Sequence, residues 1–573
     1  MVDSLRVVPD PQSSVNDQQA IGYVVGGGLQ ESFRVRLTVD PLSVQEGAFV
    51  VIESGAYLFY GLVTDMQLGA TDPRFADEQS EKRLSPVLAR ALHGQTLFTN
   101  LEVLPALMFE RGPDPALPEY AEWQRGHADR SPRPVPVKTV PAHHSPVRLA
   151  SEGDIAEIFG KPGEEGKFII GYTREQGHPV CVDLKQLVQR SAGVFGATGT
   201  GKSFLTRLVL AGLIQHNKAS VLVLDMHNEY GYDSVDPDSK LRAYGLKSKF
   251  AARVRVVGLG RGATIRGAAP DFNLEIAESD VSTADIELLT RELNLKETTP
   301  TTLDALWDSF RNDWFSQFKA MTQDVIATED GKKVPAADSV EAWANANGVN
   351  VMAAVALHGK MRRLFHTPYI VPKPAADTVK QITESLSTGQ HIVLSFAGFD
   401  SDLDYLLVSN LLTRKLRETW VHKADEFRKS GKDEPRQLVI VLEEAHKLLN
   451  REMAVQTTFS TIARELRKYY VTLLVVDQRP SQIYDEVMSQ LGTRISGWLG
   501  DEDDIHAVLS GLAGREALRG MLARLQPKAE VLLLGWGVPM PLPVRSRRYD
   551  DAFWKELLGS KRGKGDGLKD LGF

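Results

Sequence analysis

The stretch Gly196-Ala197-Thr198-Gly199-Thr200-Gly201-Lys202-Ser203 decides how the central part of this chain folds. It matches the phosphate-binding loop pattern G-x-x-x-x-G-K-[ST] at every fixed position. The apolar residues 191–195 before it predict a buried strand, and residues 204–211 after it carry apolar side chains at helical spacing. Strand, glycine-rich loop and helix in this order predict an α/β core that binds a nucleotide. A glycine-rich turn with a chance lysine is the competing interpretation, and the flanking strand and helix disfavour it.

The residue types in this stretch suit a triphosphate. Glycines let the backbone curl with its N–H groups pointing inward, and the helix that follows adds its positive N-terminal end. Lys202 is expected to reach the β- and γ-phosphates, and the Ser203 hydroxyl to ligate Mg²⁺. The predicted cofactors are ATP and Mg²⁺, and the predicted phosphate-binding residues are Gly196, Thr198, Gly199, Thr200, Gly201, Lys202 and Ser203.

Length and composition bound the rest of the molecule. The 573 residues predict about two to four domains, and 42% hydrophobic with 25% charged residues is ordinary for a soluble protein. A single cysteine, Cys181, excludes an internal disulfide and fits a reducing cytoplasm. No apolar run approaches the ~18 residues that span a bilayer, so we expect a cytoplasmic protein without a membrane segment. Because the net charge is −7, contact with nucleic acid must come from a local basic patch.

The pattern along the chain divides it into several parts. Residues 1–19 are polar and predict a flexible tail, and residues 20–150 carry short strands typical of a small barrel or sandwich. Residues 151–545 alternate strands with helices, which predicts a parallel sheet covered by helices. Within this core, residues 278–388 read as a helical insertion. Residues 546–573 form a C-terminal extension with one short helix.

More detailed expectations concern single elements. The proline-rich residues 130–146 predict an extended linker or an edge strand. The expected strands of the core are 168–170, 192–195, 220–224, 254–257, 391–396, 438–442, 471–476, 494–499 and 530–534. The expected helices of the insertion are 282–293, 302–322, 349–365 and 376–386.

Three predicted strands end in polar side chains. The apolar run 438–442 ends in Glu443 and Glu444, of which Glu443 is expected to hold Mg²⁺ and Glu444 to act as general base toward water. The run 471–476 leads to Gln478, which is placed to contact the γ-phosphate or the lytic water, or else caps a helix. The run 220–224 ends in Asp225, a candidate for the Mg²⁺ and water network.

The predicted helix after Glu444 carries Arg464 and Arg467, three residues apart on one face. At a subunit boundary, such an arginine reaches the γ-phosphate bound by a neighbour. A solvated basic face is the other interpretation that the spacing allows.

These motifs together resemble the HerA family of the HerA–FtsK group of P-loop ATPases. The resemblance covers about residues 20–545. It is carried by the phosphate loop, Asp225-Met226-His227-Asn228-Glu229-Tyr230, Glu443-Glu444-Ala445-His446, Ala463-Arg464-Glu465-Leu466-Arg467 and Gln478-Arg479-Pro480-Ser481. Asn228, Glu443 and Asp477 depart from the family pattern, which more often has glycine, aspartate and a small hydroxyl residue there.

The resemblance implies a RecA-like core of the additional-strand type, an N-terminal barrel of the HAS kind and a ring of six subunits. It implies that duplex DNA passes through the pore, and that a NurA-like nuclease binds the barrel face. It also implies Glu444 as catalytic acid, Gln478 as γ-phosphate sensor and Arg464 or Arg467 as the finger supplied in trans. The candidates for DNA contact, each also readable as a solvated surface, are Arg261, Arg266, Lys360, Arg362 and Arg363.

The expected function is therefore an ATP-driven, hexameric DNA translocase or helicase that acts with the nuclease in resecting DNA ends for recombinational repair. The alternative is an ATP-gated ring scaffold that activates a nuclease or an NAD-consuming effector in phage defence. A dependence of ATP hydrolysis on linear DNA separates the two.

Overall fold

The computed structural model describes residues 19–29, 31–71, 97–113, 116–126, 133–235, 242–327, 333–454 and 458–559. The predicted tail, apart from its last residue, and the end of the C-terminal extension lie outside these ranges. The chain forms two compact units, and each is described by itself. The first unit comprises residues 1–184, 196–201 and 493–547, and the second comprises 185–195, 202–492 and 548–573. The sequence-based boundary at residue 150 stays a prediction.

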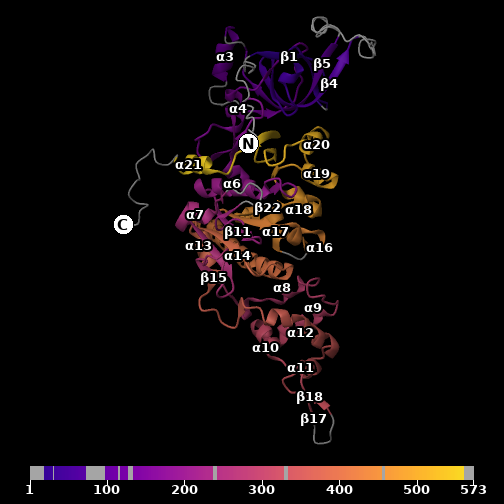
Figure 1. Ribbon diagram of the computed structural model, residues 1–573, viewed down its shortest axis with the longest axis vertical. Helices are drawn as coiled ribbons and strands as arrows, with labels where there is room; N and C mark the ends of the chain where they lie inside the picture. Colours follow the sequence, from indigo (N-terminus) through magenta and orange to yellow (C-terminus); the bar gives the residue numbers. More distant parts are fainter. Residues whose placement is uncertain are drawn as a thin grey trace, which may run out of the picture. The chain divides into compact units, whose positions relative to one another are not determined.

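The N-terminal part of the first unit is a closed, six-stranded antiparallel barrel, as predicted (Figure 1). Its strands follow the order β2-β1-β7-β3-β4-β5, and β2 pairs with β5 to close it. The strands are β1 (Ala20–Gly26), β2 (Phe33–Leu37), β3 (Phe49–Ser54), β4 (Tyr57–Ala70), β5 (Leu97–Glu110) and β7 (Pro146–Leu149). Inward-facing side chains such as Ile21, Val35 and Val50 are fully buried in the barrel core. Closure removes the exposed edges of the sheet.

The proline-rich segment adds a short edge strand to this barrel. β6 (Val135–Pro136) pairs antiparallel with β5, which agrees with the edge-strand interpretation. Proline suits an edge because it has no N–H to donate to a further strand. The remaining helices of the first unit are α3 (Glu119–Gly126), α4 (Glu152–Phe159), α19 (Glu502–Leu509) and α20 (Arg515–Ala523).

The first unit also contains a run of five antiparallel strands, and here the prediction of parallel strands was wrong. The order is β23-β24-β25-β8-β9, with every adjacent pair antiparallel. The strands are β8 (Lys167–Tyr172), β9 (Pro179–Asp183), β23 (Thr493–Ser496), β24 (Glu530–Gly535) and β25 (Leu542–Ser546). Two of the connections, from β8 to β9 and from β24 to β25, are short hairpin loops. A parallel pair needs a crossover of a dozen residues or more, so these loops enforce antiparallel pairing.

The second unit is built on seven parallel strands in the order β15-β14-β20-β11-β21-β22-β10. The strands are β10 (Ala192–Phe195), β11 (Ser220–Asp225), β14 (Val254–Leu259), β15 (Phe272–Leu274), β20 (His391–Ser395), β21 (Leu438–Glu443) and β22 (Val471–Asp477). Their near-continuous apolar runs are what a sheet buried on both faces requires. β22 lies between β10 and β21, as the additional-strand architecture predicts.

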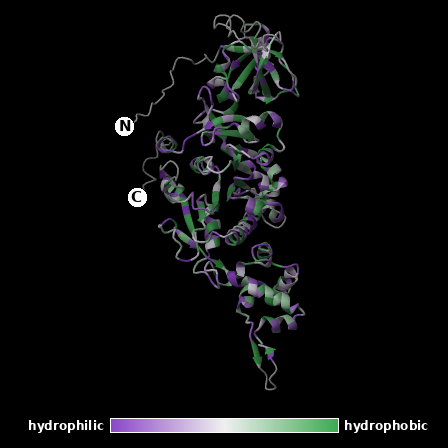
Figure 2. Ribbon diagram, turned by 45° about the vertical axis from the view of Figure 1, so that its right-hand side comes forward, coloured by the Kyte–Doolittle hydropathy of each residue, from purple (hydrophilic) through white to green (hydrophobic). Residues whose placement is uncertain are grey.

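Helices cover this sheet (Figure 1). α6 packs against β10 and β11, α13 against β11 and β20, and α17 against β22. Figure 2 colours the strands of this sheet mostly green, whereas the helices around them mix green with purple. The helices outside the insertion are α5 (Leu184–Gln189), α6 (Lys202–Gln215), α7 (Leu246–Phe250), α14 (Asp402–Ser430), α15 (His446–Leu449), α16 (Arg451–Ala454), α17 (Thr458–Glu465), α18 (Asp485–Gln490) and α21 (Asp551–Gly559).

The predicted helical insertion is present, with corrected helix boundaries. Its helices are α8 (Thr283–Glu287), α9 (Thr299–Phe310), α10 (Trp314–Ala320), α11 (Val340–Ala346), α12 (Val351–Phe365) and α13 (Thr378–Ser387). The helix expected over 282–293 ends at Glu287, and the one expected over 302–322 breaks at Arg311, which adopts a φ of 51°. The sequence pattern also missed a hairpin of β17 (Val325–Ala327) and β18 (Lys333–Pro335), visible beyond α11 in Figure 1. The insertion has its own aromatic core around Trp314, Phe318 and Phe365.

Candidate functional site

The glycine-rich loop adopts the curled backbone that its sequence requires. Gly199 and Gly201 have φ values of 76° and 87°, in the left-handed region that favours glycine. The Thr200 hydroxyl donates to the Ala197 carbonyl at 2.7 Å, which fixes the turn. α6 begins at Lys202, and Ser203 is its second residue. The loop therefore runs directly into a helix N-terminus, an arrangement that favours phosphate.

Lys202 is mostly buried among carboxylates. Burial lowers the pKa of its ammonium group, while the charges of Glu444, Asp477 and Glu443 act in the opposite direction. These acids lie at the ends of β22, which pairs with β10, and of β21, which pairs with β22. The parallel sheet thus brings the predicted lysine and the predicted acid pair into one electrostatic neighbourhood.

Glu443 is the last residue of β21 and is 5% exposed. Its carboxylate accepts a long hydrogen bond from the His227 amide at 3.5 Å, and its carbonyl accepts one from the Tyr405 hydroxyl at 2.7 Å. Burial, together with the neighbouring carboxylates of Asp225 and Glu229, raises the pKa of Glu443 well above its usual value. Glu443, Asp225 and Glu229 therefore lie close enough together to affect one another's ionisation.

Glu444 lies just past the strand in a strained conformation. Its φ is 45°, in a region that non-glycine residues rarely adopt and that costs about 1–3 kcal/mol. The Gln478 amide donates to its Oε1 at 2.9 Å, and the Lys447 amide donates to its carbonyl at 2.9 Å. Strain of this kind persists only where surrounding bonds hold it, and it is common at active sites.

Asp225 ends β11 and holds the turn that follows, and its part in the Mg²⁺ and water network stays a prediction. It is buried, and its two oxygens accept the amide hydrogens of Glu229 at 2.7 Å and Tyr230 at 2.9 Å. Burial raises its pKa to about 6. These bonds fix the turn after β11, in which Asn228 adopts a φ of 57°. The left-handed backbone explains why glycine is common at position 228 in the resembled family and why asparagine is tolerated there.

The sequence-based reasoning missed the pair formed by His446 and Asp477. Asp477 ends β22, is fully buried, and accepts from His446 Nδ1 at 3.0 Å. The hydrogen bond to Asp477 raises the pKa of His446. Burial disfavours the ionised form of Asp477, yet the hydrogen bond and charge of His446 hold its pKa below the usual range. The sequence motifs assign no function to either residue, and the two are brought together by the pairing of β21 with β22.

The candidate finger arginines lie where the helix changes form. α17 ends at Glu465, and residues 466–469 continue as a 3-10 helix that carries an exposed Arg467. Arg464 lies on α17, and its side chain is outside the described part of the structure. The assignment of either as a trans finger stays a prediction.

The DNA candidates fall on separate elements. Arg261 is 76% exposed and pairs with Glu275 at 3.0 Å, and Arg266 donates to the Asn228 carbonyl at 2.9 Å. The other three lie on α12, where Arg362 is exposed. Lys360 bonds the Asn294 carbonyl, and Arg363 bonds the Ser401 hydroxyl at 2.7 Å. Of these five, Arg266 contacts the turn that follows β11.

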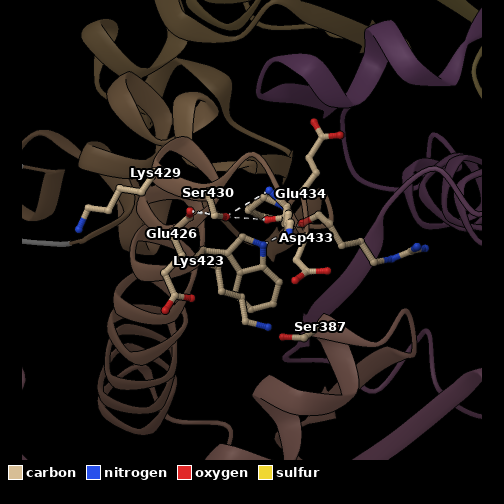
Figure 3. Close-up of a pocket in the computed structure, with 11 residues that line it drawn as sticks. Ser387, Lys423, Glu426, Lys429, Ser430, Asp433 and Glu434 are labelled. Carbon is tan, nitrogen blue, oxygen red and sulfur yellow. Dashed lines mark hydrogen bonds between the residues drawn. The ribbon is translucent and has the colours of Figure 1, made fainter.

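A surface cavity of about 660 Å³ lies away from these acids. It is lined by the last turns of α14, by Ser387 and by residues 432–436, which precede β21. Figure 3 shows Lys423, Glu426, Asp433 and Glu434 around it. Because β21 starts at Leu438 and ends at Glu443, this cavity belongs to the opposite edge of the parallel sheet. Its mixture of basic and acidic side chains selects no particular ligand charge.

A phosphate loop, a parallel sheet with an added strand, and an acid at the adjacent strand end define a P-loop ATPase. Residues 167–416 match the family model described as "Helicase HerA, central domain". The DNA double-strand break repair helicase HerA of Sulfurisphaera tokodaii is 25% identical over 557 residues, covering 94% of each chain. Its counterpart in Pyrococcus furiosus is 23% identical, covering 74% of this chain and 76% of the relative. The predicted resemblance to the HerA family is thereby confirmed.

Among solved structures, similar chains include VirB4 of Thermoanaerobacter pseudethanolicus, with a TM-score of 0.42 and 16% identity over 67% of this chain and 97% of that one. The conjugative coupling protein TrwBΔN70 has a TM-score of 0.44 and 12% identity over 70% of this chain and 92% of that one. Among the helices in the described ranges, none is both long and apolar enough to cross a membrane.

Proposed function

We propose that this protein hydrolyses ATP to move along duplex DNA, and that it serves as a translocase or helicase in the repair of DNA breaks. The observation that carries the proposal is the convergence of Lys202, Glu444 and Gln478 at the ends of neighbouring parallel strands. A relative named as a DNA double-strand break repair helicase matches 94% of the chain. This similarity supports the proposal that ATP hydrolysis is coupled to movement on DNA.

In this proposal the loop amides from Gly196 to Gly201 and the Lys202 ammonium bind the triphosphate. The Thr198 and Thr200 backbone belongs to the same cradle. Lys202 is the first residue of α6 and lies in the field of Glu444, Asp477 and Glu443, so its charge is held close to the loop that would bind phosphate. The N–H dipoles of the loop are already oriented toward the phosphates before the reaction, so stabilising the charge that develops on them requires no reorganisation of the protein.

The residues fit a magnesium ion. The described residues hold no cluster of three or more His, Cys, Asp or Glu side chains arranged as a metal cage. Mg²⁺ uses one or two protein oxygens together with phosphates and waters, so a cage is not required. Ser203 and Glu443 would hold it, Glu443 through water; burial and then the carboxylates of Asp225 and Glu229 raise the pKa of Glu443, and a nearby cation would favour its ionised form. When bound, the ion neutralises charge on the phosphates.

Glu444 then acts as general base toward the attacking water, and Gln478 orients that water or senses the γ-phosphate. The bond between their side chains keeps both on one side of the site. Asp225 supports the site by fixing the turn that donates to Glu443. Arg467 or Arg464 is proposed to complete a neighbouring subunit's site in a six-membered ring. A NurA-like nuclease on the barrel face, and DNA contact through Arg261, Arg266 and α12, complete the proposal.

The test is ATP hydrolysis by the purified protein with and without linear duplex DNA, alongside strand translocation measured by displacement of a bound protein block. DNA is expected to stimulate hydrolysis, and stimulation should be lost in Lys202→Ala. An ATP hydrolysis rate that is the same with and without DNA, together with no translocation, would contradict the proposed translocase and favour the ATP-gated scaffold.

A further inference from the structure

We propose that Asp477 and His446 are positioning residues that hold the Glu444 carboxylate and the Gln478 amide in the geometry for ATP hydrolysis. The inference rests on the proposed function, because it takes Glu444 and Gln478 to act at the γ-phosphate. It concerns two residues for which the phosphate-loop motif and the strand-end acids assign no part.

Asp477 anchors two turns at once. Its Oδ2 accepts the His446 amide hydrogen at 2.7 Å, and its Oδ1 accepts the Arg479 amide hydrogen at 2.7 Å. The first bond holds the turn that follows Glu444, and the second holds the turn that carries Gln478. A fully buried carboxylate needs several such donors, and these two bonds with the imidazole supply them. One side chain therefore fixes the backbone on both sides of the site.

His446 closes the arrangement into a ring of contacts. Its Nδ1–H donates to Asp477 at 3.0 Å, and the same nitrogen lies 3.7 Å from Glu444 Oε2. Glu444 Oε1 accepts from Gln478 at 2.9 Å, and Gln478 follows Asp477 in the chain. Each of the four residues is thus linked to its neighbour in the ring by a hydrogen bond, a close charge contact or a peptide bond. Such networks are worth more than the sum of single pairs.

The ring explains how Glu444 keeps a left-handed backbone. At a φ of 45°, its side chain would relax to another orientation unless the residues after it were held. The bonds from Asp477 to His446, with the 2.9 Å bond from the Lys447 amide to the Glu444 carbonyl, supply that restraint. The charged groups that face the imidazole are Asp477, Glu444 and Lys447.

The register of the sheet places this anchor opposite the last residue of β10, the strand that leads into the phosphate loop. Asp477 is opposite Phe195 on β10, the residue directly before Gly196. On its other side, Val476 is opposite Glu443 on β21. β22 therefore carries Asp477 between the strand that leads into the loop and the strand that leads into the acid pair.

The experiment compares Asp477→Asn, His446→Asn and the double variant in steady-state ATP hydrolysis and in equilibrium binding of a fluorescent ATP analogue. Each single variant should lower kcat about 10- to 100-fold, because a small displacement of reacting groups costs that much. Affinity for the analogue and KM should stay within roughly twofold of the wild type. The double variant should be no slower than the slower single variant, since the two residues act as one unit.

Asp285→Asn is the matched control. Asp285 is also a buried carboxylate, it belongs to the cap at the start of α8, and it accepts bonds from Arg414 at 2.8 Å and Asn410 at 2.9 Å, both on α14. This variant should lower the melting temperature without lowering kcat. His446 is part-exposed, so His446→Asn tests the inference even if Asp477→Asn does not fold.

Wild-type kcat in both single variants would overturn the inference. A fall in kcat that is accompanied by equal losses of nucleotide affinity and of melting temperature would overturn it too, because a general loss of structure would then explain the result. Losses that multiply in the double variant would show that the two residues do not act together, which also overturns it. Glu444→Gln separates this failure from failure of the proposed function. If that variant hydrolyses ATP normally, the assignment of Glu444 is wrong, whatever Asp477 and His446 do.

Discussion

Gln478 Nε2 donates a hydrogen bond to Glu444 Oε1 at 2.9 Å, and this bond joins the ends of two neighbouring parallel strands, β22 and β21. A glutamine that holds a carboxylate oxygen leaves the other oxygen, Oε2, for the proton of an attacking water. Glu444→Gln should therefore lower kcat for ATP hydrolysis by about 100-fold or more while ATP still binds. Single-turnover hydrolysis and equilibrium nucleotide binding check this.

Glu486→Gln is the control for that change, because Glu486 lies on α18, away from the strand-end acids in the chain, and its carboxylate accepts a local bond from the Tyr484 hydroxyl at 2.9 Å. It should hydrolyse ATP at the wild-type rate. Equal rates in Glu444→Gln and Glu486→Gln would remove Glu444 from the chemistry.

Lys202 carries the phosphate-loop assignment. Lys202→Ala removes the buried ammonium that faces Glu444 and Glu443, and it should weaken ATP binding and lower hydrolysis by about 100-fold. Lys380→Ala, at an exposed position of α13 that pairs with Glu384 at 3.9 Å, should change neither. Isothermal titration with ATP and magnesium measures the first effect directly, and unchanged affinity in Lys202→Ala would contradict the site.

The sequence allowed prediction of those parts of the site that depend on local chemistry. The loop from Gly196 to Ser203 needs glycines and a lysine in fixed order, and Glu444 follows an apolar run that can only be a buried strand. The partnership of His446 with Asp477 depends on which strands are adjacent, and no local pattern states that β22 lies between β10 and β21. The side-chain role of Asp225 was similarly hidden, because its bonds to Glu229 and Tyr230 depend on how the following turn curls.

The fold shows the same division. Apolar runs located many of the strands, but such a run does not state the direction of a strand, so β8, β23 and β24 were expected parallel and are antiparallel. In the insertion, the apolar periodicity located α12 within two residues, whereas the left-handed Arg311 broke a helix that periodicity alone would continue.

A finger supplied in trans predicts that two inactive variants restore each other. Glu444→Gln subunits keep their arginines, and Arg467→Ala subunits keep their acid, so mixed rings contain interfaces with both groups intact. Mixing the two proteins before ring assembly should recover a substantial fraction of wild-type hydrolysis. The same experiment with Arg464→Ala decides which arginine acts.

The mixture of Glu444→Gln with Lys202→Ala is the control, because both changes damage the site of the subunit that carries them. No interface in that mixture is intact, so hydrolysis should stay at the level of the variants alone. Recovery there, or none with either arginine variant, would place the finger elsewhere.

Arg261 is a DNA candidate whose own side chain is 76% exposed, although its ion-pair partner Glu275 is buried. Arg261→Ala should weaken binding of linear duplex DNA and reduce the salt dependence of that binding, because each lost phosphate contact lowers the slope by about 0.9. Arg311→Ala is matched to it, being 64% exposed and paired with Asp308 at 3.2 Å on the insertion. Equal salt slopes in the two variants would show that Arg261 does not face DNA.

The ion pair of Asp477 with His446 gives stability a definite pH dependence. The hydrogen bond to Asp477 raises the pKa of His446 above 6.5, so the folded state binds the imidazole proton more tightly than the unfolded state does. The resulting contribution to the free energy of unfolding is fully present below about pH 6.5, and it is lost as the pH rises through the raised pKa of His446. Burial alone would raise the pKa of Asp477, but hydrogen bonds from His446 and from two backbone amides lower it below 3.8. The contribution of Asp477 to the free energy of unfolding is therefore present above about pH 4, and it is lost as the pH falls through the lowered pKa. The melting temperatures of the wild type and of Asp477→Asn should therefore differ most between about pH 4 and 6.5, and the difference should shrink toward pH 9 as the imidazole of His446 loses its proton. A difference that stays constant from pH 5 to 9 would mean that His446 does not carry its proton against Asp477, and that the contact is held by neutral hydrogen bonds instead.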